Sequence, residues 1–106
     1  MQRVGFILKV KESRIESYKQ GHKKVWPDML QALRDAGWHN YSLFMRDDGL
    51  LFGYLETPDF EQALAKLGEA EANSRWQAAF ADYFEDLEGK TPNQSILQLE
   101  EVFHLD

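Results

Sequence analysis

The stretch YKQGHKKVWP, residues 18–27, organises the chain. Read as a helix, it places Tyr18, His22 and Trp26 four residues apart on one face, with neighbouring Cβ atoms about 5–6 Å apart. Pro27 lacks the N–H of an ordinary helical residue and its ring clashes with an earlier carbonyl, so it predicts a kink or a new helix start. The stretch therefore predicts an imidazole between two aromatic rings, beside a break in the helix.

Length and composition predict one domain, residues 1–106, with 43% hydrophobic and 28% charged residues. The net charge of −6 argues against a nucleic-acid partner, which requires a basic surface. The absence of cysteine excludes disulfides and thiolate ligands. The apolar run from Val4 to Leu8 is too short for a signal peptide or a membrane span. We therefore expect a cytoplasmic protein with no membrane partner.

The first half of the chain predicts a strand, a broken helix and a second strand. Residues 3–10 are rich in the apolar types typical of strands. Ser13, with Glu16 three residues later, predicts a capping box for the helix, and Gly37 predicts its end. Gly21 costs about 1 kcal/mol relative to alanine inside a helix, so we expect it to permit a close contact. Residues 38–46 then form the second strand.

The second half predicts a hairpin, two helices and a last strand. Residues 47–49, Asp-Asp-Gly, indicate a hairpin turn into a third strand over residues 50–56, which is apolar on both faces. Asp59 predicts the cap of a short helix through Leu67, ended by Gly68. A longer helix is predicted over residues 70–87, a loop over 88–93 and a fourth strand over 96–105.

This order, strand–helix–strand–strand–helix–strand, is that of the ferredoxin-like βαββαβ fold, an α+β arrangement with helices on one face of the sheet. The two-sided apolar third strand needs cover on its other face as well. A ligand cavity or a second subunit would supply it. Together with helices on one face only, this predicts a homodimer that buries the bare sheet faces against each other.

Several kinds of site are excluded or disfavoured by the motifs. The chain has no nucleophile elbow, phosphate-binding glycine loop or His-Glu-x-x-His helix. Its histidines, His22, His39 and His104, share no short metal-ligand spacing, so we expect no metal. Histidine is the side chain that exchanges protons near neutral pH, and His22 has aromatic neighbours that suit a polyhydroxylated ring. The plainer alternatives are a partly exposed helix histidine for His22 and a core residue for Trp76.

The chain resembles the L-rhamnose mutarotase family, small cytoplasmic enzymes that act at the anomeric carbon of a sugar. The matching residues are Tyr18, His22, Trp26-Pro27, His39-Asn40-Tyr41, Leu51-Phe52, Arg75-Trp76 and Glu101-Val102-Phe103. They keep their order over nearly the whole chain.

The resemblance implies a dimeric α/β barrel of ferredoxin-like subunits and an isomerase that interconverts the α and β anomers of L-rhamnose without a cofactor. It implies that His22 is the catalytic proton donor and that Tyr18, Tyr41 and Trp76 contact the sugar. Gln77 stands where the family pattern often has a second tryptophan, and an amide there is expected to bind a sugar hydroxyl. Two other functions stay open: a dimeric α/β-barrel monooxygenase, because related barrels host that chemistry, and a non-catalytic sugar-binding module.

Overall fold

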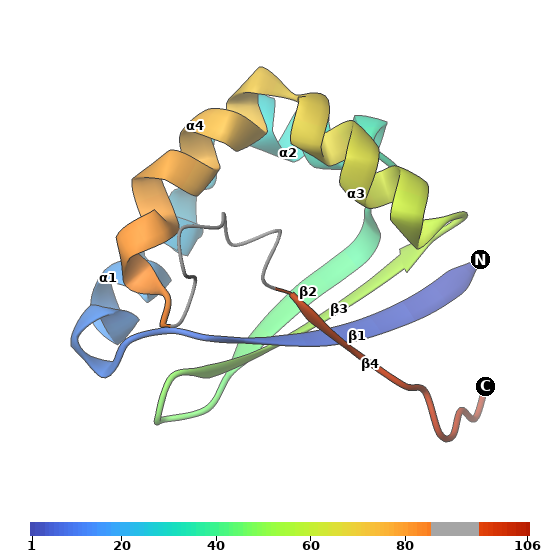
Figure 1. Cartoon of the computed structure of the whole chain (residues 1–106), viewed down its shortest axis with the longest axis horizontal. Helices are drawn as coiled ribbons and strands as arrows, with labels where there is room; N and C mark the ends of the chain where they lie inside the picture. Colours follow the sequence, from blue (N-terminus) through green and yellow to red (C-terminus); the bar gives the residue numbers. More distant parts are fainter. Residues whose placement is uncertain (86–95) are drawn as a thin grey trace.

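The computed structural model describes residues 1–85 and 96–106 as a single sheet covered by helices (Figure 1). The strands are β1 (Gln2–Lys9), β2 (His39–Met45), β3 (Leu50–Thr57) and β4 (Leu97–Leu99). The helices are α1 (Ile15–Gly21), α2 (Pro27–Asp35), α3 (Phe60–Glu69) and α4 (Glu71–Phe80), with short 3-10 turns at Glu12–Arg14, His22–Lys24 and Ala81–Tyr83. None of the helices in this part of the chain is long and apolar enough to cross a bilayer.

The four strands are antiparallel in the order β2-β3-β1-β4. Figure 1 shows α1 to α4 on one side of this sheet, with β4 at its edge beside β1. This confirms the predicted ferredoxin-like βαββαβ arrangement. A core forms where the helices meet the inner face of the sheet, because alternate residues of β1 and β3 point toward them. Val4 and Phe6 of β1 and Leu51 and Leu55 of β3 are at most 2% exposed there.

The hairpin between β2 and β3 forms at the predicted turn. Gly49 has a φ of +95°, a backbone conformation that is unfavourable for residues with a side chain. Its carbonyl accepts a hydrogen bond from the Val10 N–H. Farther along the hairpin, β2 contains one more residue than β3 between His39 and Ser42. This bulge is centred on Asn40, whose φ of 47° is one that asparagine tolerates better than most residues.

The helical segment after β1 breaks where the proline predicts, and α2 begins with Pro27 at its first position. The predicted capping box is wrong. Ser13 lies inside a 3-10 turn, and α1 begins after Arg14 without a side-chain cap. The turn keeps Ser13 from the position immediately before the helix, where its hydroxyl could accept from the first free N–H groups.

In the second half, the Asp59 cap is confirmed, because its carboxylate accepts from the Gln62 N–H. Gly68 does not end α3, which continues to Glu69. The predicted helix over residues 70–87 is too long, since α4 ends at Phe80. The chain leaves the helix there to pair with the end of β1: Lys11 donates to the Tyr83 carbonyl and Glu85 donates to the Lys9 carbonyl.

The fourth strand is also shorter than predicted, with only residues 97–99 paired to β1. Beyond it, the link to β1 is made by side chains, because the Arg3 guanidinium donates to both carboxylate oxygens of Glu101 at 2.8 and 3.0 Å. The predicted loop over residues 88–93 and the end of the predicted helix at Leu87 lie outside the described residues.

Candidate active site

A cavity of about 490 Å³ lies between the helices and the inner face of the sheet. All five residues that the sequence predicts for the site line it: Tyr18, His22, Tyr41, Trp76 and Gln77. They come from α1 and the turn after it, from β2 and from α4. The fold thus brings together residues that are up to 59 positions apart in the printed sequence.

His22 lies at the end of α1 and is held by Tyr18, one turn earlier. The two rings stack with centroids 4.1 Å apart. His22 Nδ1 lies 2.9 Å from the Tyr18 carbonyl oxygen. A carbonyl oxygen can only accept, so we assign the proton of the neutral ring to Nδ1. Nε2 then carries the lone pair that can take a proton.

Burial sets the charge state of the site. It lowers the pKa of His22, against a smaller raising effect from the bond to the Tyr18 backbone. It also raises the pKa of the Tyr18 and Tyr41 phenols. The cavity therefore holds a neutral imidazole and protonated phenols at neutral pH, which is a set of groups suited to moving protons among uncharged hydroxyls.

The inner face of α4 forms one wall of the cavity. Its Trp76 and Phe80 rings contact the imidazole of His22 with centroids 5.2 and 5.3 Å away, respectively. Gln77 is on the same wall, and its Nε2 donates to Asn73 Oδ1 at 3.4 Å. Asn73 was not predicted as a site residue. Its spacing of three and four residues from Trp76 and Gln77 is the signal that could have identified it.

Gly21 lets α1 and α4 approach closely. A Cβ at this position would lie 2.6 Å from Cζ of Phe80, which is too short for any real contact. The expectation that Gly21 permits a close contact is confirmed. This approach brings the Phe80 ring against both Tyr18 and His22.

Tyr41, on β2, forms the wall of the cavity opposite α4. Its ring packs edge-on against Trp38 at 5.0 Å, and the Trp38 indole N–H donates to the Ala63 carbonyl at 3.2 Å. Trp38 was assigned only to the start of a strand from the sequence. Its role as the support of Tyr41 depends on the bulge at Asn40, which the sequence pattern does not reveal.

Trp26 does not continue the Tyr18 and His22 face as a regular helix would. Residues 25 and 26 are extended, as expected before a proline, so the indole reaches Trp76 instead, at 5.0 Å between centroids. Arg75 lies over the Trp26 ring at 5.5 Å and forms an ion pair with Asp28 of α2. These contacts join the start of α2 to α4 at the cavity.

Within residues 1–85 and 96–106, no group of three histidine, aspartate or glutamate side chains could hold a metal ion. His39 and His104 both lie outside the cavity lining. His104 Nε2 is instead 2.8 Å from Asp106 in the exposed C-terminal segment.

Comparisons with known proteins agree over nearly the full length. The family model for L-rhamnose mutarotase matches residues 3–105. The L-rhamnose mutarotase of Bacillus subtilis strain 168 is 36% identical over 107 residues, covering 100% of both chains. That of Oceanobacillus iheyensis is 34% identical with the same coverage. The crystal structure of an L-rhamnose mutarotase from Formosa agariphila superposes with a TM-score of 0.78 at 28% identity, again over 100% of both chains.

A more distant solved structure shares only the fold. It is a Nitrosomonas europaea protein provisionally named an antibiotic biosynthesis monooxygenase, with a TM-score of 0.63 and 15% identity over 96% of this chain.

Proposed function

The chain belongs to the L-rhamnose mutarotase family, and we propose that it interconverts the α and β anomers of L-rhamnose as one domain over residues 1–106. The observation that supports this most strongly is the placement of His22. Its Nδ1 is occupied by a backbone carbonyl, its ring lines the cavity, and burial favours the neutral form. These are the properties of a proton carrier for an uncharged substrate.

The proposed reaction needs one proton to move between two oxygens of the same carbon. His22 Nε2 takes the proton of the anomeric hydroxyl, and the resulting imidazolium donates it to the ring oxygen as the C1–O5 bond breaks. The open aldehyde rotates about C1–C2, and the reverse transfers close the ring on the other face. Acid–base catalysis of this kind contributes typically 10²–10⁴-fold, and no oxidant or reductant is consumed.

The other proposed site residues hold the sugar in place. Trp76 offers an apolar ring face to the C–H groups of the sugar, and the protonated Tyr18 and Tyr41 phenols can donate hydrogen bonds to its oxygens. Gln77 adds an amide that can bind a hydroxyl. All four line the same cavity as His22.

We also propose that the chain acts as a homodimer joined through the outer face of the sheet. The strand registers place Phe44, Phe52, Ile7 and Leu97 side by side across all four strands of this face. Phe44 is 62% and Leu97 63% exposed. A contiguous exposed apolar row of this kind is typical of an interaction surface.

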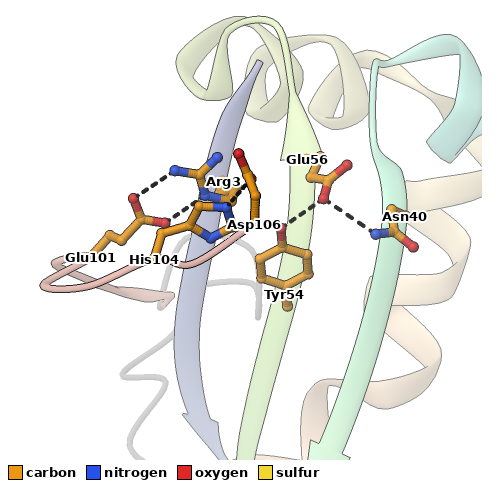
Figure 2. A network of polar contacts seen from close by, with 7 residues as sticks. All are labelled: Arg3, Asn40, Tyr54, Glu56, Glu101, His104 and Asp106. Carbon is orange, nitrogen blue, oxygen red and sulfur yellow. Dashed lines mark hydrogen bonds and ion pairs between the residues drawn. The ribbon is translucent and has the colours of Figure 1, made fainter.

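Polar side chains border this apolar row toward the start of β1. Figure 2 shows Arg3 paired with Glu101, and Glu56 accepting hydrogen bonds from Tyr54 and Asn40. The bond from the Tyr54 hydroxyl is 2.7 Å long and that from the Asn40 amide 3.3 Å. An apolar centre with a polar rim is the usual composition of a protein interface. An obligate dimer of this type is expected to bury on the order of 2,000 Å² or more.

Exchange NMR on the anomeric protons of L-rhamnose, with catalytic amounts of protein, tests the activity. Cross-peaks between the two anomers should build up faster with the protein than in buffer alone. Sugar binding without faster exchange would instead identify a non-catalytic binding module. An absorbance spectrum after mixing with heme tests the monooxygenase alternative. The cytoplasmic location is part of the same proposal, and cell fractionation tests it.

A further inference from the structure

Trp26 belongs to the stretch that organises the chain, but the proposed chemistry does not use it. It is partly exposed and does not line the cavity. Its ring nevertheless meets the Trp76 indole edge-on, with an interplanar angle of 84° and centroids 5.0 Å apart. Trp76 has two other ring neighbours, His22 and Phe80, and both of these line the cavity. Among the described residues, Trp26 is therefore the one ring neighbour of Trp76 that lies outside the cavity lining.

A ring that faces a cavity has fewer packing contacts than a ring inside a core, because one of its sides meets no protein atoms. The contacts on its remaining sides then decide how firmly it is oriented. Phe80 packs against Trp76 with centroids 4.5 Å apart, but it belongs to the same helix, α4. Trp26 immediately precedes α2, so it ties the Trp76 ring to a second element. The orientation of Trp76 thus depends on the start of α2 as well as on α4.

The position of Trp26 is itself fixed by two features. Pro27 favours an extended backbone for the residue before it, and Trp26 has a φ of −57° and a ψ of 135°. The Arg75 guanidinium lies 5.5 Å from the centroid of the Trp26 ring, in a cation–π contact. Arg75 in turn forms an ion pair with Asp28 of α2. The Trp26 indole thus contacts both Arg75 and Trp76, which are neighbours in α4.

We propose that Trp26 is a positioning residue for the sugar site, which holds the Trp76 indole in the orientation that meets the substrate. The inference rests on the proposed function, because it takes Trp76 as a sugar contact. Trp26 lies outside the cavity lining, so it does not itself touch the sugar. Loss of its ring should weaken sugar binding, since Trp76 becomes free to adopt other orientations. The turnover rate should hardly change, because His22 keeps its contacts with the backbone and the ring of Tyr18.

The test measures kcat and KM for L-rhamnose by exchange NMR and the sugar Kd by titration. Trp26→Leu should raise KM and Kd by about tenfold and change kcat by less than about threefold. Trp26→Phe keeps a ring at this position, so all of these constants should stay within about threefold of the wild-type values.

Tyr83→Leu is the matched control. Tyr83 is likewise a ring outside the cavity lining, and the Arg14 guanidinium lies 5.1 Å from its centroid. It contacts Phe80 and not Trp76 among the described ring pairs. Its replacement should therefore leave KM and Kd for L-rhamnose unchanged.

Two further readouts separate positioning from a general loss of stability. In a Trp76→Leu background, Trp26→Leu should raise Kd by less than about twofold, because the ring that Trp26 positions is already absent. The second readout is fluorine NMR of protein labelled with 5-fluorotryptophan, which gives one resonance for each of the three tryptophans. The Trp76 resonance should broaden or shift in Trp26→Leu, and the Trp38 resonance should not. Thermal unfolding shows whether each variant is folded.

A folded Trp26→Leu variant with the wild-type Kd would overturn the inference. So would an unchanged Trp76 resonance, a larger effect on kcat than on KM, or equal losses of affinity with and without the Trp76 ring. If Trp26→Leu does not fold, Arg75→Gln replaces it in the test, because it removes only the exposed cation over the Trp26 ring. It should raise Kd by about threefold and alter the Trp76 resonance, and the absence of either effect overturns the inference.

Each of these results leaves exchange of L-rhamnose by the wild-type protein, and so the proposed function, intact. A wild-type protein that binds the sugar without exchanging its anomers would remove the proposed function. In that case the Kd values would still decide whether Trp26 positions Trp76.

Discussion

His22 Nδ1 lies 2.9 Å from the carbonyl oxygen of Tyr18, while the Tyr18 ring stacks on the imidazole at 4.1 Å. A single residue thus orients the imidazole with its side chain and determines its tautomer with its backbone. The backbone part of this arrangement persists in any substitution of Tyr18 that keeps the helix. The roles of the two residues can therefore be separated by mutation.

Replacing His22 by asparagine should lower the rate of anomer exchange by about 10²-fold or more, because asparagine cannot exchange protons near neutral pH. Sugar affinity should change little, since the other walls of the cavity remain. Exchange NMR and a sugar titration on one preparation measure both quantities. Tyr18→Phe is the matched control: it keeps the stack and the backbone acceptor and reports on the phenol alone. Near wild-type exchange by His22→Asn would remove His22 from the mechanism.

The rate should fall on acidification with a midpoint below the ordinary histidine pKa of 6.5, because burial lowers the pKa of His22. The neutral ring must take the first proton, so kcat/KM should be level above this midpoint. The free energy of unfolding should also fall on acidification, because His22 has a lower pKa in the folded chain than in the unfolded chain, which therefore binds the proton first. The contribution of His22 to stability is present above pH 6.5 and is lost as the pH falls toward its folded pKa.

Exchange NMR over roughly pH 5 to 8, corrected for the uncatalysed rate, measures the midpoint. A midpoint above 6.5 would show that a charged neighbour, rather than burial, dominates at His22.

Gly21→Ala should destabilise the protein by roughly 1–3 kcal/mol, because the added Cβ would lie 2.6 Å from the Phe80 ring. This cost outweighs the gain of about 1 kcal/mol in helix propensity. Gly68→Ala in α3 is the control, since its Cβ would meet no atom within 4 Å, and it should be stabilising. Urea unfolding of both variants measures the difference. If Gly21→Ala raised the free energy of unfolding, as Gly68→Ala is expected to do, that result would contradict the close approach of α1 and α4.

Phe52→Lys should dissociate the proposed dimer, because it introduces a charge into the centre of the outer apolar row. Ala79→Lys, at an exposed position on α4, is the control and should leave the assembly unchanged. Sedimentation of both variants and the wild-type protein at micromolar concentration gives the assembly state. A wild-type protein that is a stable, folded monomer would contradict the proposed dimer.

The sequence predicted those features that depend on local signals. Pro27 interrupts the helical segment after β1, Asp59 caps α3, and Gly49 adopts the conformation of the hairpin turn. Each of these effects comes from the residue type itself and needs no contact with a distant part of the chain. All five predicted site residues line one cavity, although their catalytic and binding roles remain proposals.

The mispredicted end of the last long helix depends on a distant part of the chain. α4 ends at Phe80 because the following residues pair with the end of β1, more than 60 positions earlier in the printed sequence. Trp76 shows why packing and function were hard to separate from sequence. It is 8% exposed, as a core residue would be, and it also lines the cavity.

The bulge at Asn40 has a consequence for how many residues this strand can contain. In an uninterrupted strand, two residues three positions apart point to opposite faces of the sheet. The extra residue reverses this relation, so that Trp38 and Tyr41 both line the cavity. Deleting Asn40 would restore the simple alternation and force one of the two rings to the outer face. Whether Trp38 and Tyr41 both line this pocket therefore depends on the number of residues between them as much as on their identities.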